Sequence, residues 1–86
     1  MKLDNRITEL IAIGASVTAN CQPCLQYHVE KALESGASDF EIAEAIEVAK
    51  AVRKGAAGKM DQFAATISKT APSNAGAPAA AGCGCS

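Results

Sequence analysis

Apolar residues recur at three- and four-residue steps through most of this chain, and this spacing limits the fold more than any other feature. The first segment carries Leu3, Ile7, Leu10, Gly14 and Val17 in that order. Such spacing places the side chains on one face of a helix, with Asp4 as its N-terminal cap and its end near Asn20. No alternating pattern typical of a strand occurs. The sequence therefore predicts an all-α fold.

A second helix is expected from about residue 21 to about residue 35. Pro23 stands where a first helical turn accommodates proline, because the first N–H groups of a helix have no partner inside it. Gly36 follows the segment and is typical of the left-handed residue that ends a helix.

A third helix is expected to begin at a capping box formed by Ser38 and Glu41, in which each side chain satisfies a backbone N–H of the other. Its apolar face carries Ile42, Ile46, Ala49 and Val52. The acidic residues of the opposite stripe are interpreted as a solvated face. Gly55 and Gly58 should weaken or kink this helix. A short fourth helical face then follows at Met60, Phe63, Ala64 and Ile67.

The charged side chains stop before the end of the chain, which indicates two regions. All nine acidic and all eight basic residues lie within residues 1–69. Residues 70–86 consist mostly of Pro, Gly, Ala and Ser and close with Cys83-Gly84-Cys85. Such a segment buries too little apolar surface to offset the entropy of ordering. We expect a helical domain over 1–69 and a flexible low-complexity tail over 70–86.

Size and composition indicate self-association. A domain of 86 residues has a small core, and its aromatic side chains are limited to one Tyr and two Phe. Alanine supplies much of the apolar content and adds little burial per residue. We therefore expect a homo-oligomer that completes the core.

Charge and hydropathy exclude several partners. The net charge is −1, so the chain lacks the basic surface of a nucleic-acid-binding protein. The weakly polar run over residues 10–19 is too short to span a bilayer, and the first residues do not resemble a signal peptide. The expected location is the cytoplasm, without membrane contact. In that reducing compartment a Cys-x-x-C pair is more often catalytic or metal-binding than structural.

The candidate catalytic residues are Glu9, Cys21, Cys24 and His28. The two cysteines, spaced i, i+3 across a helix start, can close a disulfide. The helix N-terminus favours a thiolate on Cys21. His28, the single histidine, lies one turn after Cys24 on the same face and can exchange a proton with a thiol near neutral pH. If the first two helices pack antiparallel, Glu9 can hydrogen-bond the imidazole and fix its tautomer. Taken singly, a helical His or Glu is more often structural or solvated.

The spacing Glu9-x11-Cys21-x-x-Cys24-x3-His28 resembles that of the alkylhydroperoxidase D-like, or carboxymuconolactone decarboxylase, family, over about residues 3–67. The resemblance implies an all-α homo-oligomer, commonly a trimer or hexamer. It also implies a thiol-dependent peroxidase or disulfide reductase in which these four residues form a proton relay. The substrate would be a peroxide or a disulfide and the electron donor an external thiol reductant or reductase. No cofactor is implied.

Other readings stay open at this level. The best-characterised peroxidases of the family carry a His between the two cysteines, where this chain has Gln22-Pro23. Dithiol chemistry is therefore indicated more firmly than a peroxide substrate. Helix position favours Cys21 as the attacking sulfur, whereas proximity to His28 and family precedent favour Cys24. Lactone decarboxylation has no need of a dithiol.

The tail cysteines, Cys83 and Cys85, have three interpretations. They form an auxiliary redox pair, or a site for a soft metal or metalloid such as Cu(I), or they have no function. The alternative function for the whole chain is thiophilic metal binding through the Cys-x-x-C pair and the tail. A closed zinc site would need a fourth ligand from Glu9, the tail or another subunit.

Overall fold

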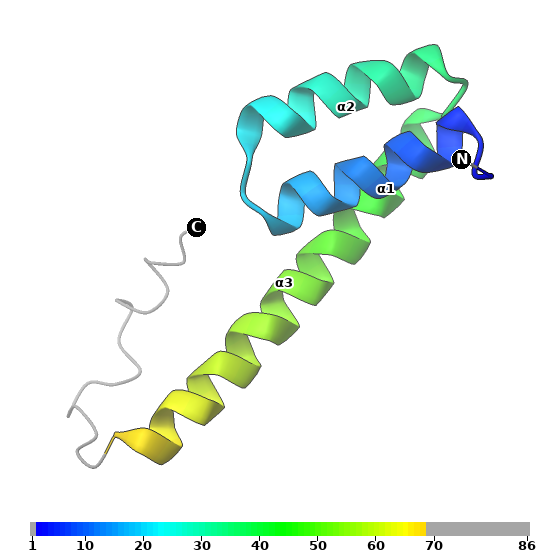
Figure 1. The fold of residues 1–86 in the computed structure, drawn as a ribbon. Helices are drawn as coiled ribbons and strands as arrows, with labels where there is room; N and C mark the ends of the chain where they lie inside the picture. The colour runs from blue at the N-terminus through cyan, green and yellow to red at the C-terminus, as the bar shows by residue number, and fades with distance from the viewer. Residues whose placement is uncertain (1, 69–86) are drawn as a thin grey trace. The chain divides into compact units, whose positions relative to one another are not determined.

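The computed structural model describes residues 2–68, which form three α-helices and contain no strand in that range. The helices are α1 (Asn5–Thr18), α2 (Gln22–Glu34) and α3 (Asp39–Ile67), as Figure 1 shows. The all-α prediction is confirmed. Contacts divide the described residues into two units, one that ends at Gly55 and one that begins at Ala56. The predicted tail over 70–86, with Cys83 and Cys85, lies outside the described residues.

In the first unit, α1 and α2 form an antiparallel hairpin joined by a short turn (Figure 1). The Asp4 side chain caps α1 by accepting a hydrogen bond from the Ile7 N–H at 2.8 Å. Asn20 in the turn has a positive φ of 58°. Such a conformation is tolerated by asparagine better than by most residues, and it reverses the chain directly before Cys21.

The connection from α2 to α3 contains the two signals expected from the sequence. Gly36 has φ 95°, a conformation that other residues rarely adopt. The capping box is present, because the Glu41 N–H donates to Ser38 Oγ and the Ser38 N–H donates to Glu41 Oε1, each at 3.0 Å. Arg6 from α1 donates to the other Glu41 oxygen at 2.6 Å and ties the start of α3 to α1.

The core lies between the hairpin and the first turns of α3. Ile13 and Ala32 are fully buried, and Ala37 and Ile42 nearly so. Half-buried aliphatic side chains surround them, namely Leu10, Leu25, Val29, Ala45 and Ile46. This core fixes the α1–α2 pairing on which the candidate site depends.

The third helix differs from the sequence prediction. Gly55 and Gly58 were expected to weaken or kink the third helix before a short fourth helical face, but α3 is a single helix through both glycines to Ile67. Neither glycine has a positive φ. Each costs about 1 kcal/mol relative to alanine, and the helix-favouring Ala, Lys and Met residues around them outweigh that cost. No helix among the described residues is long and apolar enough to cross a membrane.

Candidate functional site

The turn between α1 and α2 fixes the first cysteine of the Cys-x-x-C pair. The Cys21 N–H donates to the Ser16 carbonyl at 3.0 Å, which ties the residue to the last turn of α1. From α3, the Arg53 guanidinium donates to the Val17 carbonyl at 2.9 Å and to Asn20 Oδ1 at 2.8 Å. The Cys21 backbone is therefore tied to α1, and Arg53 of α3 ties down the turn that precedes it.

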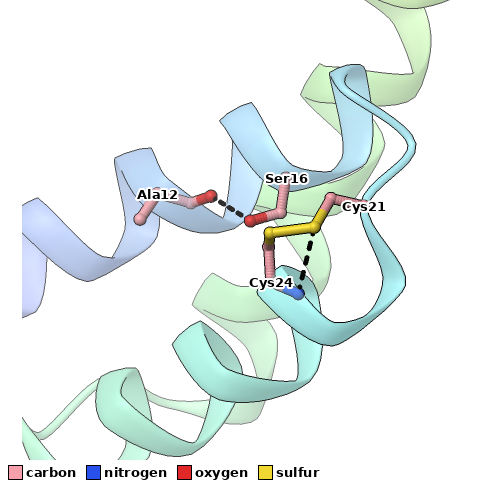
Figure 2. Close-up of a disulfide and its surroundings, with 4 residues drawn as sticks. All are labelled: Ala12, Ser16, Cys21 and Cys24. Atoms are coloured by element: carbon pink, nitrogen blue, oxygen red, sulfur yellow. Dashed lines mark hydrogen bonds between the residues drawn. A yellow bond between two sulfur atoms is a disulfide. The ribbon is translucent and has the colours of Figure 1, made fainter.

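Cys21 and Cys24 form a disulfide across the first turn of α2, with their Cα atoms 5.3 Å apart (Figure 2). Cys21 is the N-cap of the helix, and its Sγ accepts a hydrogen bond from the Cys24 N–H at 3.3 Å. A sulfur in that position meets the unpaired N–H groups of the helix start, which favour negative charge. Cys21 is half-buried, whereas Cys24 is exposed.

Glu9 on α1 and His28 on α2 meet across the hairpin. Glu9 Oε1 lies 2.7 Å from His28 Nδ1, and the two side chains are 21% and 29% exposed. The contact expected from antiparallel packing is thus present. Because a carboxylate only accepts, Nδ1 carries the proton and Nε2 is left with the lone pair or with a second proton. The Tyr27 ring packs edge-on against the imidazole, with ring centroids 5.0 Å apart.

Among the described residues, no hydrogen bond joins the Glu9–His28 pair to the Cys21–Cys24 pair in the disulfide state. His28 is one helical turn beyond Cys24 on α2. Within residues 2–68, the one hydrogen bond to a sulfur is the backbone bond from Cys24. The structure therefore brings Glu9 to His28 and Cys21 to Cys24. A proton relay that connects the pairs stays a prediction.

One polar side chain beside the cysteines was missed by the sequence reasoning. Ser16 is 5% exposed and is the only buried polar residue in the described part of the chain. Its Oγ donates to the Ala12 carbonyl at 2.7 Å. Figure 2 shows it among the surroundings of the disulfide. The available signal was its position seven residues after Glu9, which places both on one face of α1.

Metal binding gains no support from the described residues. Among them, no group of three or more His, Cys, Asp or Glu side chains is placed to hold a metal ion. Cys21 and Cys24, the two cysteines in the described range, are bonded to each other. The alternative that uses Cys83 and Cys85 lies outside the described range.

Comparison with known families extends the geometric description. The family model for carboxymuconolactone decarboxylases matches residues 1–68. The chain belongs to the carboxymuconolactone decarboxylase family. The match covers all three helices and both residue pairs, so the resemblance inferred from the four-residue spacing is confirmed. This family includes decarboxylases and peroxidase-like enzymes.

A relative in Paracoccus denitrificans, named "uncharacterized protein 4 in cox locus", is 42% identical over 55 residues. Those residues cover 64% of this chain and 50% of the relative, so the chain spans about half the length of the curated protein it matches. No solved structure matches the chain.

Proposed function

We propose that the protein is a thiol-dependent oxidoreductase that cycles between a Cys21–Cys24 dithiol and disulfide and reduces a peroxide or a substrate disulfide. The observation that carries the proposal is the disulfide at the start of α2, on the hairpin that also holds the Glu9–His28 pair. A redox-active disulfide needs a sulfur that solvent reaches and a nearby group that exchanges protons. The exposed Cys24 and the half-buried His28 supply these two requirements.

Glu9 and His28 divide the proton chemistry between them. Glu9 accepts the Nδ1 proton and orients the ring, so that Nε2 is the nitrogen that takes a proton from a thiol or returns one. Among the described residues, Nε2 has no hydrogen-bond partner in the disulfide state. When the disulfide opens, the leaving thiolate takes up a proton, and before the next attack the Cys24 thiol must lose one. His28, one turn beyond Cys24, is the side chain that we propose for both transfers.

We infer different roles for the two sulfurs from the different exposure of Cys21 and Cys24. Cys24 is exposed and attacks the substrate, whereas Cys21 is half-buried and resolves the product. With a hydroperoxide, the Cys24 thiolate attacks the terminal oxygen, the O–O bond breaks, and the alcohol leaves with a proton. The sulfur becomes a sulfenic acid, oxidised by two electrons.

The second half of the cycle returns the protein to its starting state. Cys21 attacks the sulfenic sulfur, water leaves, and the Cys21–Cys24 disulfide closes. An external dithiol then supplies two electrons and two protons. A disulfide substrate follows the same course, with a mixed disulfide in place of the sulfenic acid. Decarboxylation, the reaction in the family name, has no step that uses a dithiol.

The test is turnover by the full chain with dithiothreitol as electron donor and either tert-butyl hydroperoxide or hydroxyethyl disulfide as oxidant. Cys24→Ser and Cys21→Ser should each abolish turnover. Gln22→Ala, which alters the same helical turn without removing a sulfur, should keep it. Full activity of the Cys24→Ser protein with both oxidants would refute the proposal.

A further inference from the structure

The buried hydroxyl of Ser16 has no role in the cycle described above, although it lies at the disulfide. Ser16 is 5% exposed, and its own carbonyl anchors the Cys21 N–H at 3.0 Å. In Figure 2 its side chain is on the face of α1 toward the Cys24 end of the disulfide. A hydroxyl in an apolar helix interface is costly to bury unless it has a partner.

In the disulfide state the Ser16 hydroxyl makes a hydrogen bond that it can give up at little cost in free energy. Its Oγ donates to the carbonyl of Ala12, one turn earlier, at 2.7 Å. In a regular helix that carbonyl also accepts the backbone N–H of residue 16, so it keeps a partner when the hydroxyl turns away. A disulfide sulfur is a weak acceptor, whereas a thiolate is charged, and hydrogen bonds to charged acceptors are about twice as strong as those to neutral ones.

We propose that Ser16 is a positioning residue for the dithiol, a hydroxyl that donates to the Ala12 carbonyl in the disulfide state and turns to the Cys24 sulfur when that sulfur becomes a thiolate. This inference deepens the proposed function, because it concerns the reduced form of the same cysteine pair. No bond to the serine forms or breaks. An external dithiol supplies two electrons to open the S–S bond, and the serine proton stays on its oxygen while its hydrogen bond changes acceptor.

The two sulfurs then have separate donors. Cys21 Sγ accepts the backbone N–H of Cys24, an interaction already present in the disulfide state at 3.3 Å. Cys24 lies three residues beyond the N-cap, inside the first turn of α2, so its sulfur depends on a side-chain donor. Ser16 supplies that donor from the neighbouring helix. Its hydrogen bond stabilises the Cys24 thiolate more than the position of Cys24 in α2 does alone.

The chain contains a matched control for this hydroxyl. Thr18, on the same helix, also donates to the carbonyl four residues earlier, at 3.0 Å to Gly14, but it is exposed. Ser16→Ala and Thr18→Ala therefore remove the same kind of helical hydrogen bond, one beside the cysteines and one away from them. Thermal unfolding followed by circular dichroism should show both variants folded, because alanine favours helix.

The test measures the stoichiometric alkylation of the reduced full-length protein by iodoacetamide as a function of pH, with the modified cysteine identified by mass spectrometry. Ser16→Ala should raise the pKa of Cys24 and slow its alkylation at pH 7 by about tenfold, as expected for loss of a hydrogen bond to a charged group. In glutathione buffers, the same variant should need up to about a tenfold higher thiol-to-disulfide ratio for half-reduction. Thr18→Ala should change neither quantity.

An unchanged Cys24 alkylation profile in Ser16→Ala, or an equal change in Thr18→Ala, would overturn the inference. These readouts need no turnover. Absence of peroxidase and reductase activity would contradict the proposed function. The alkylation and glutathione measurements would still decide the role of Ser16.

Discussion

At the scale of single residues, the site consists of two bonded pairs with different requirements. The Glu9–His28 contact depends on two helices packed in the right register, and a spacing of nineteen residues in sequence does not by itself guarantee it. The Cys21–Cys24 pair depends only on the first turn of α2. The cysteine pair was therefore predictable from local spacing, whereas the Glu9 contact required the antiparallel hairpin to be assumed.

Substitution of His28 tests the proton exchange. His28→Ala should raise the pKa of the attacking thiol and reduce turnover at pH 7 by about 10²-fold, the size usual for loss of a general acid–base group. The measurements are pH-dependent alkylation and steady-state kinetics. Glu30→Gln, an exposed change on the same helix, serves as the control and should leave both unchanged. An unaltered thiol pKa in His28→Ala would remove the imidazole from the scheme.

The burial of Ser16 beside the disulfide could not be predicted from the sequence. A serine inside a helical pattern is ordinarily solvated, and nothing in a single sequence separates the buried Ser16 from the exposed Thr18 two residues later. Only the packed hairpin shows that Ser16 is buried at the disulfide. Residues whose role depends on contacts between helices escape a reading based on local spacing.

At the scale of elements, the helix boundaries marked by capping residues were better predicted than helix continuity. Asp4, Pro23, Gly36 and the Ser38–Glu41 box act through local backbone groups, and each is present at the expected position. The continuity of the third helix was predicted less well, because the cost of two glycines is small against the helical preference of the Ala, Lys and Met residues around them. Whether a helix continues depends on the helix propensity summed over the whole segment, and a single helix-weakening residue does not end it.

The capping box at the start of α3 should make stability depend on pH. The Ser38 N–H hydrogen bond lowers the pKa of Glu41 below its usual value of 4.5, with the Arg6 charge as a smaller cause. A carboxyl with a lowered pKa contributes stability at pH values above its unfolded pKa, and the contribution fades as the pH falls through the folded pKa. Glu41→Gln should therefore melt at a lower temperature than the wild type at pH 7, and the gap should close below pH 4.5.

The matched control for that experiment is Glu44→Gln, an exposed acidic residue on the same helix. It should leave the melting temperature at pH 7 nearly unchanged. A gap for Glu41→Gln that stays constant from pH 7 to pH 3 would show that the charge of Glu41 plays no part.

The glycines of the chain should respond to substitution according to their backbone conformation. Gly55 is helical with open space around it, so Gly55→Ala should raise the free energy of unfolding by about 0.5–1 kcal/mol. Gly36 also has open space but φ 95°, so Gly36→Ala should lower it by about 1 kcal/mol or more. Urea denaturation measures both. Destabilisation by Gly55→Ala would contradict an uninterrupted helix at that residue.

At the scale of the whole molecule, the described residues leave much apolar surface uncovered. A groove of about 540 Å³ lies between α1 and the first half of α3, and its lining is almost wholly apolar. Ile11, Val48 and Val52 line it and are 57%, 64% and 57% exposed. Exposed apolar area of this kind on so small a domain is typical of an interface. We propose that a second copy of the chain covers the groove, in line with the expected homo-oligomer.

Light scattering coupled to size exclusion tests this proposal. The wild type should elute with a mass above that of one chain, and Val48→Asp should reduce it toward a monomer, because a carboxylate in an apolar interface is costly to desolvate. Leu33→Asp, an exposed apolar position outside the groove, should keep the larger mass. A monomeric wild type, or an unaltered mass in Val48→Asp, would contradict the assignment of this surface.

The central claim is that Cys21 and Cys24 are a reversible redox pair, and redox titration tests it most directly. The full-length protein is equilibrated in a series of glutathione buffers, free thiols are trapped by alkylation, and the modified cysteines are mapped by mass spectrometry. Cys21 and Cys24 should lose and regain their thiols together, in a single two-electron transition that dithiothreitol reverses. A pair that stays reduced across the whole series, or that titrates as two independent thiols, would contradict it.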